Sequence, residues 1–441
     1  MSLLQRFKKL PYVFQYLYDK VTTSIALLPS LMALGFVLLT SFMIYLERSG
    51  LTPWMDKHLP SFVLIKSWDV AEAILTTLIG ALISLMVFSF SMVMVLLNNA
   101  ASNYSPRILP SLIADRFHQF VLGTYLGTII YCILFVINMT PSQPDIPLPG
   151  FSVLFGIFMG ISCLMLFVLF IHSISESVQV GKILERINVE TNFNMDNGIG
   201  AFLTDESPPT NSTDWPTYNA DRSGYLRSVN IDDLYYLCST EEIKLRMLVP
   251  ESRFILEGNA LFSTDKKIDK EIVDKILGKF VLSTNGLAKD DYVVGFKFIT
   301  EIAVKAMSPG INDPGTALSA IDYLTILFIK KMELPQHGAV RKKDKYGRKL
   351  PTRLWLNIVT FDELLAFVLA PLRQYSRHDL MVILKMLEMM SFLYSQNHPN
   401  DAFREIIRRE IMIIKEDAEK HLTNTADYKR VLLMIDEILE Q

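Results

Sequence analysis

Residues 151–174 read FSVLFGIFMGISCLMLFVLFIHSI, and no Asp, Glu, Lys or Arg interrupts them. An α-helix needs about 20 mostly apolar residues to cross the roughly 30 Å hydrocarbon core of a bilayer. This stretch is long and apolar enough to do so, and it therefore predicts a transmembrane helix.

Three earlier stretches meet the same requirement. The first could be a secretory signal, but its apolar part is too long and no signal-peptidase site of small residues follows it. We therefore expect a retained anchor. With residues 151–174, these stretches predict four transmembrane helices. The three are Ile25–Leu46, Val70–Leu97 and Phe120–Met139.

Most of the charged residues follow Glu176, which predicts a second, water-exposed part. Short β-like segments occur in residues 225–262, and helical patterns fill the chain from Lys270 onward. The expected fold class is therefore an α-helical membrane protein with four transmembrane helices, followed by a cytoplasmic α+β domain. The expected parts are a cytoplasmic N-terminal segment (1–20), the four-helix transmembrane domain (21–176), a linker helix and polar loop (177–222), a small β-rich module (223–265) and a mainly helical cytoplasmic domain (266–441).

Composition narrows the classes of function. The formal net charge is only -3, so bulk electrostatics do not indicate a nucleic-acid partner. The three cysteines, Cys132, Cys163 and Cys238, lack the spacing of a disulfide framework or a zinc site. We expect no metal and no cofactor.

Lys and Arg near the ends of the apolar stretches indicate the orientation, because basic residues favour cytoplasmic flanks. The N-terminal flank, the loop between the second and third stretches and the segment after the fourth are basic. Loop 141–149 has Asp145 and no basic residue, whereas loop 47–67 carries both signs. We expect a multi-pass protein with both termini in the cytoplasm.

Small residues spaced four apart mark the third and fourth stretches. Such residues lie on one helix face and let two backbones approach closely. We expect packing within the bundle, with self-association as the alternative. The helix-packing candidates are Gly123, Gly127, Ser152, Gly156 and Gly160.

The second stretch carries small and polar residues in steps of three and four, which places them on one stripe of a helix. Two interpretations remain open: a pore-lining face, or a helix interface held by hydroxyl groups. The pore-lining candidates are Thr77, Gly80, Ser84, Ser91 and Asn98.

His172 and Glu176 lie one helical turn apart at the end of the fourth stretch. A histidine beside a carboxylate can titrate near neutral pH, so the pair is a pH-sensing candidate. An interfacial hydrogen bond without a regulatory role is the alternative.

The segment 341–353 is strongly basic, with Asp344 as its single acid. Clustered Lys and Arg can bind anionic lipid headgroups or a phosphorylated ligand. A charged hairpin or loop without a ligand is the alternative.

The sequence AMSPGINDPGTA at residues 306–317 predicts a tight joint between two helices. Pro309 and Gly310 end one helix, and Asp313 with Pro314 begins the next. Free backbone N–H groups at such a joint could also hold an anion. The ligand-binding candidates are Ser308, Gly310, Asn312 and Asp313.

The same segment carries a resemblance to a known family. Together with residues 103–109, 115–119, 123–127, 223–226 and 291–303, the string Ser-Pro-Gly-Ile-Asn-Asp-Pro resembles the DUF2254 family of bacterial predicted membrane proteins. Gly315 departs from the bulkier residue expected there. The resemblance implies four spans and a bacterial inner membrane, and it supplies no reaction.

Two hypotheses for the function follow. One is an oligomeric ion channel or conduit with a cytoplasmic regulatory domain. The other is a membrane-anchored sensor or scaffold whose cytoplasmic domain binds a protein or a small anionic ligand. An enzyme is not expected, because no phosphate-binding loop, nucleophile elbow or dinucleotide fingerprint occurs. The expected partners are the lipid bilayer and further copies of the chain.

Overall fold

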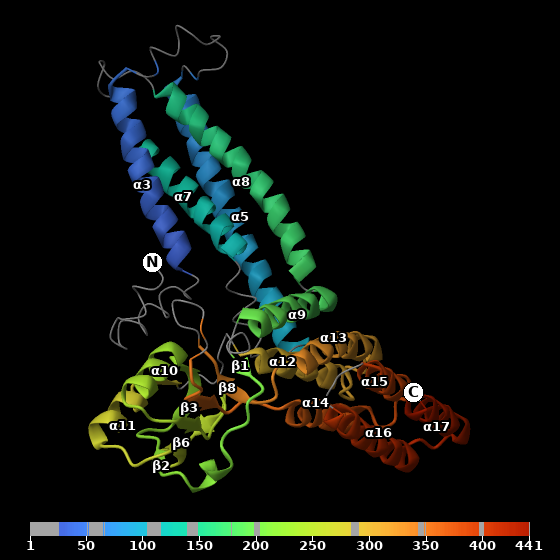
Figure 1. Cartoon of the computed structure of the whole chain (residues 1–441). Coiled ribbons are helices and arrows are strands. Elements are labelled where there is room, and N and C mark those ends of the chain that lie inside the picture. The colour runs from blue at the N-terminus through green and yellow to red at the C-terminus, as the bar shows by residue number, and fades with distance from the viewer. Residues whose placement is uncertain are drawn as a thin grey trace. The chain divides into compact units, whose positions relative to one another are not determined.

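The computed structural model describes residues 26–50, 52, 65, 67–103, 116–138, 149–177, 179–197, 203–283, 291–342, 348, 350–396 and 401–440. The expected N-terminal segment, 1–20, lies outside these ranges. The chain forms two compact units, Met1–Gln179 and Val180–Gln441 (Figure 1).

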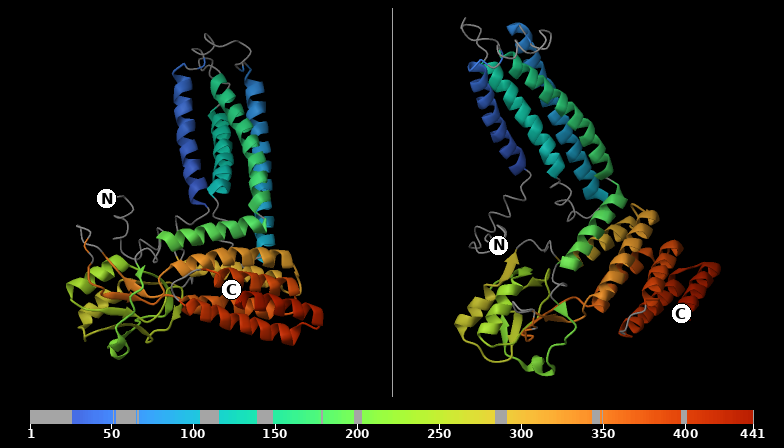
Figure 2. Two further views of the ribbon diagram at one scale, coloured as in Figure 1. Left: turned by 45° about the vertical axis from the view of Figure 1, so that its right-hand side comes forward. Right: turned by 45° about the horizontal axis from the view of Figure 1, so that its top comes forward.

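Long helices that run alongside one another build the first unit (Figures 1 and 2). Each contains a stretch long and apolar enough to cross a membrane, so the described part of the chain has the four candidate membrane helices that the sequence predicts. The helices are α3 (Leu27–Arg48), α5 (Trp68–Asn103), α7 (Arg116–Asn138) and α8 (Gly150–Ser177).

Helix α7 is the central helix of this bundle, because α3, α5 and α8 all pack on it. Bulky side chains fill the space between the helices, so the interior of the bundle is closely packed. These include Leu75, Tyr131, Phe135, Leu82, Tyr125 and Phe170.

The described part of the second unit contains two β-sheets. The larger has the strand order β1-β8-β9-β4-β6-β2, and the smaller has the order β5-β3-β7. All neighbouring strands are antiparallel except β4 and β9, which are parallel. The strands are β1 (Leu203–Thr204), β2 (Thr217–Asn219), β3 (Gly224–Val229), β4 (Leu245–Met247), β5 (Phe254–Ile255), β6 (Ala260–Thr264), β7 (Phe280–Ser283), β8 (Gly338–Val340) and β9 (Leu354–Leu356).

Two helices, α10 (Ile231–Thr240) and α11 (Lys270–Leu277), share an apolar core with these sheets. Leu226, Leu245 and Phe262 of the strands contact this core together with Leu234 of α10 and Ile276 of α11. A short 3-10 helix, Thr210–Asp214, precedes β2.

The remaining helices pack on one another. Helix α9 contacts α12 and α13. A row of four phenylalanine rings connects α12, α13, α14 and α16. The ring centroids are 4.8 Å apart between Phe296 and Phe328, 5.8 Å between Phe328 and Phe361, and 4.8 Å between Phe361 and Phe403. The helices are α9 (Val180–Asn197), α12 (Tyr292–Ala306), α13 (Pro314–Glu333), α14 (Phe361–Ser376), α15 (Leu380–Tyr394), α16 (Ala402–His421) and α17 (Thr425–Leu439).

The observed elements correct two expected boundaries. The β-rich module predicted at 223–265 is too small, because β1 and β2 precede it and β7, β8 and β9 follow it. The segment 177–222 is not simply a linker, since α9 buries Ile183, Leu184 and Ile187 and packs on α12 and α13. Contacts between segments far apart in the sequence produce both differences. Leu203 of β1 pairs with Val340 of β8, and α9 packs on α12 and α13.

Candidate functional site

The polar stripe of α5 lies on the outside of the bundle. The side chains of Thr77, Ser84 and Ser91 are exposed. Their hydroxyl groups donate to carbonyl oxygens one turn earlier in the same helix, at 2.7, 3.0 and 2.9 Å. A Cβ atom added at Gly80 would meet nothing within 4 Å. Asn98, at the end of the stripe, is exposed as well.

The other face of α5 makes the contacts with the bundle. Ala71, Leu75 and Leu82 are buried there, among side chains of α7 and α8. Within the described bundle, the polar stripe is therefore not an interface between helices.

Gly123 and Gly127 lie where α7 meets α3. A Cβ atom at Gly123 would lie 2.6 Å from the sulfur of Met32, and one at Gly127 would overlap the ring of Phe36. The absence of side chains at these glycines lets the two backbones approach closely.

Gly156 and Gly160 place α8 against α5. A Cβ atom at Gly156 would lie 3.2 Å from the side chain of Leu75, and one at Gly160 would lie 2.7 Å from that of Leu78. The two helices therefore meet along the small-residue face of α8.

Ser152 belongs to a buried polar cluster that sequence reasoning missed. Glu47, at the end of α3, is only 7% exposed. One oxygen of its carboxylate accepts hydrogen bonds from the backbone N–H of Ser152 at 2.9 Å and from its hydroxyl at 2.8 Å. The other accepts from the Thr52 hydroxyl at 2.7 Å, whose oxygen accepts from the Phe151 N–H at 3.1 Å.

This arrangement gives the first turn of α8 a carboxylate cap. N–H groups of a first helical turn lack partners within the helix, and a negative charge there also interacts favourably with the helix dipole. Tyr131 of α7 adds a third helix to the cluster, since its hydroxyl donates to the Ser152 carbonyl at 2.8 Å. Glu47 and Ser152 are far apart in the sequence, so no local pattern could indicate their contact.

His172 and Glu176 lie on an exposed face of α8. Their side chains are 73% and 53% exposed, and the His172 Nε2 lies 3.9 Å from a Glu176 oxygen. A buried histidine lies elsewhere in this bundle: His118 is 5% exposed, with its Nε2 3.4 Å from the Ser173 hydroxyl.

The joint at residues 308–313 is a capped turn between α12 and α13. The Asp313 carboxylate accepts from the Thr316 N–H at 3.1 Å and from the Thr316 hydroxyl at 2.6 Å, and these bonds lower the pKa of Asp313. Asn312 has a positive φ of 49°, and the Ser308 hydroxyl donates to the Lys305 carbonyl at 2.7 Å. A carboxylate already caps α13, which disfavours an anionic ligand at that place.

The basic segment 341–353 is only partly described, because residues 343–347 and 349 lie outside the described ranges. Two of its described cations lie beside acids. Lys342 forms an ion pair with Asp232, and Arg341 lies 3.8 Å from Glu206. These partners reduce the positive charge that the two residues offer to an anion.

Lys331 of α13 is a further residue that sequence reasoning missed. Its side chain is fully buried, with its Nζ 5.4 Å from the ring centroid of Tyr292. Burial lowers the pKa of this amine to about 8, against the attraction of Asp205 and Glu363. It follows Leu324, Leu327 and Phe328 in helical steps of three and four, a spacing that could have indicated an inward-facing lysine.

Comparisons with known proteins agree with the membrane architecture. The model of a family described as "Predicted membrane protein (DUF2254)" matches residues 22–391. Uncharacterized proteins of Mycobacterium bovis and Mycobacterium tuberculosis are 23% identical over 381 residues, which cover 82% of this chain and 70% of theirs. No solved structure matches. The family match covers most of the chain, from the first membrane helix into α15, and the chain therefore belongs to the DUF2254 family of predicted membrane proteins.

Proposed function

We propose that the protein is a homo-oligomeric ion conduit in which the polar stripe of α5 faces other copies of the chain and lines the path. One observation carries this proposal: Thr77, Gly80, Ser84 and Ser91 are exposed on the outside of the described bundle. A Cβ atom added at Gly80 would meet nothing within 4 Å.

The packed interior of the bundle favours a path between copies over one through a single chain. Tyr125, Tyr131 and Phe170 are fully buried between the four helices. The hydroxyls of the α5 stripe donate to their own helix but keep acceptor capacity, which water or a cation can use. Pores lined by hydroxyl and apolar groups can conduct.

The proposal also includes the location. Basic flanks favour an arrangement with both termini and the charged second unit in the cytoplasm. The family description and the apolar helices support a membrane, and we propose that it is a bacterial inner membrane.

Cysteine crosslinking tests whether α5 faces another copy. The native thiols of Cys132, Cys163 and Cys238 are buried, so a thiol introduced on an outer face is the reactive one. A Ser84→Cys variant should form a crosslinked dimer in membranes under mild oxidation. Ser41→Cys provides the matched control, because Ser41 is likewise exposed and bonded to its own helix on α3. Equal crosslinking at both positions, or none at Ser84, contradicts the proposal.

Ion flux from proteoliposomes tests conduction itself. Replacing Thr77, Ser84 and Ser91 together by Leu should abolish flux, since it removes the polar groups from the path. Ser41→Leu should leave flux unchanged. Purified wild-type protein that carries no current under voltage, tension or a change of pH contradicts the conduit.

The second candidate is a membrane-anchored sensor or scaffold. The second unit has its own apolar core, which suits an independent binding function. A protein that crosslinks through Ser84→Cys but conducts no ions supports this candidate, because the membrane helices then only anchor and associate. An anionic lipid or ligand at the basic segment 341–353 would be part of that role.

A further inference from the structure

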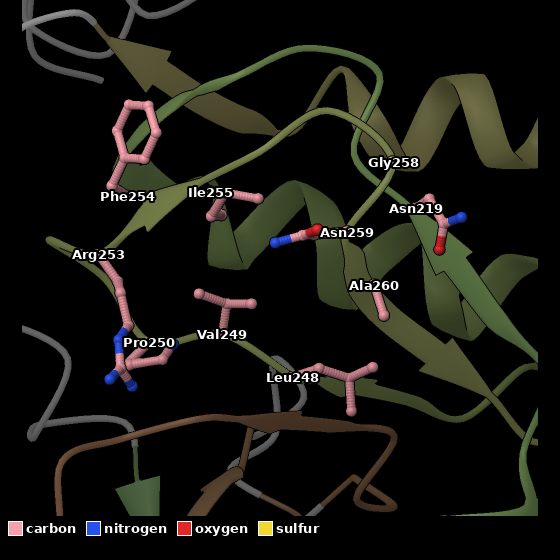
Figure 3. Close-up of a pocket in the computed structure, with 10 residues that line it drawn as sticks. All are labelled: Asn219, Leu248, Val249, Pro250, Arg253, Phe254, Ile255, Gly258, Asn259 and Ala260. Atoms are coloured by element: carbon pink, nitrogen blue, oxygen red, sulfur yellow. The ribbon is translucent and has the colours of Figure 1, made fainter.

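The β-containing part of the second unit has an open hollow of about 610 Å³. Its walls come from the chain between β4 and β6 and from the end of β2. Figure 3 shows Arg253 and Pro250 at one side of the hollow and Asn219 at the other, with Val249, Ile255 and Asn259 between them. Small-molecule sites commonly measure about 300–1,000 Å³, so the hollow can hold a molecule of metabolite size.

The lining combines one cation with amides and an apolar wall. Among the described residues that line the hollow, Arg253 is the only ionisable one, and Asn219 and Asn259 supply side-chain amides. Val249, Pro250 and Ile255 supply the apolar surface. A guanidinium group presents N–H donors in a planar fork that matches a carboxylate or a phosphate.

Arg253 differs from many other basic residues of this unit in its surroundings. Lys279, Lys330 and Lys342 each form an ion pair with an aspartate. Within the described part of the chain, the Arg253 guanidinium has no ion pair and no hydrogen bond to a side chain. It is exposed at the rim of the hollow, so its donors are available to a ligand.

Backbone hydrogen bonds hold the rim in place. The Leu248 N–H donates to the Leu261 carbonyl at 3.0 Å, and the Gly258 N–H donates to the Ala220 carbonyl at 3.0 Å. The Arg253 carbonyl accepts from the Leu226 N–H of β3 at 3.0 Å. Because these hydrogen bonds already order the rim, less conformational entropy is lost when a ligand binds.

We propose that this hollow binds a small organic anion whose carboxylate or phosphate group contacts Arg253. The amides of Asn219 and Asn259 donate to its polar atoms, and its apolar body lies against Val249, Pro250 and Ile255. The site differs from the candidates in the basic segment and in the joint at 308–313. It is independent of whether the membrane helices conduct.

Isothermal titration of the full-length protein in zwitterionic nanodiscs tests the site with phenyl phosphate and benzoate as probes and phenol as the neutral comparison. Either anion should bind saturably, and phenol should not. Arg253→Met should weaken anion binding about tenfold or more, because hydrogen bonds to a charged group are lost. The anion affinity of Arg253→Lys should lie between those of the wild type and Arg253→Met, since lysine keeps the positive charge but lacks the planar fork of donors.

Arg222→Met is the matched control, because Arg222 is an exposed arginine of the same unit that does not line the hollow. Its anion affinity should equal that of the wild type. The proposal is overturned if neither probe binds saturably, if phenol binds as tightly as the anions, or if Arg222→Met weakens binding as much as Arg253→Met. Unchanged melting temperatures of both variants show that any loss reflects binding rather than unfolding.

Discussion

Glu47 and Ser152 connect three helices of the bundle. The Glu47 carboxylate of α3 accepts from the Ser152 N–H and hydroxyl of α8, and the Ser152 carbonyl accepts from the Tyr131 hydroxyl of α7. Glu47→Ala leaves the Ser152 N–H and hydroxyl without this acceptor in a buried place. We expect the free energy of unfolding to fall by about 1–3 kcal/mol. The measurement is the thermal midpoint of the purified protein in detergent.

Ser49→Ala is the control for that change. Ser49 is exposed, and its hydroxyl donates to the Tyr45 carbonyl of its own helix. Its midpoint should stay near that of the wild type. Equal thermal midpoints for the Glu47→Ala and Ser49→Ala proteins would show that the cluster contributes little to stability.

Lys331 should make stability depend on pH in the alkaline range. Its pKa is about 8 in the folded protein against 10.5 as the ordinary value, so between these pH values the unfolded chain binds one more proton. Stability therefore rises with pH from about 8 to 10.5, and below 8 the penalty for a buried charge is fully present. Lys331→Met should raise the free energy of unfolding at pH 7 by up to roughly 3 kcal/mol.

Denaturation at pH 7, 9 and 10 checks the pH dependence. The difference between Lys331→Met and wild type should shrink as the pH rises, because the wild-type amine loses its proton. Lys429→Met removes an exposed lysine of α17 and should leave the wild-type profile unchanged. A stability difference that is the same at all three pH values contradicts this interpretation.

The close contact between helices α7 and α3 depends on the absence of a side chain at Gly127. Gly127→Ala places a methyl group on the Phe36 ring, which must move. We expect a loss of about 1–3 kcal/mol of stability from this overpacking. Gly35→Ala on α3 is the matched control, because its Cβ atom would meet nothing within 4 Å. Thermal midpoints should separate the two alanine variants, and equal midpoints would argue against a tight α3–α7 contact.

The elements show which parts of the fold the sequence could predict. Helix α13 begins at Pro314 as predicted, because Asp313 and Pro314 are local start signals. Strands such as β8 and β9 are only three residues long, so no alternation is visible in them. Their partners lie far away in the sequence, and pairing rather than local pattern defines them.

Contacts between distant parts of the sequence also limit what could be predicted about the candidate sites. The spacing of Thr77, Ser84 and Ser91 placed them on one stripe, because helical period is a local property. Which side of α5 contacts the bundle depends on α7 and α8, and the sequence left both interpretations open. The hollow beside Arg253 combines Asn219 of β2 with residues that follow β4, so it exists only once the sheets have formed.

For the whole molecule, the proposed orientation predicts opposite labelling at two positions. Ser49 lies at the end of α3 and Ser395 at the end of α15, and both are exposed. If both termini are cytoplasmic, a maleimide that cannot cross membranes should label Ser49→Cys in intact spheroplasts. It should reach Ser395→Cys only after the membrane is permeabilised. The wild-type protein is the blank, because its three cysteines are buried. Labelling of Ser395→Cys in intact spheroplasts, with Ser49→Cys protected, would place the second unit outside the cytoplasm and reverse the proposed arrangement.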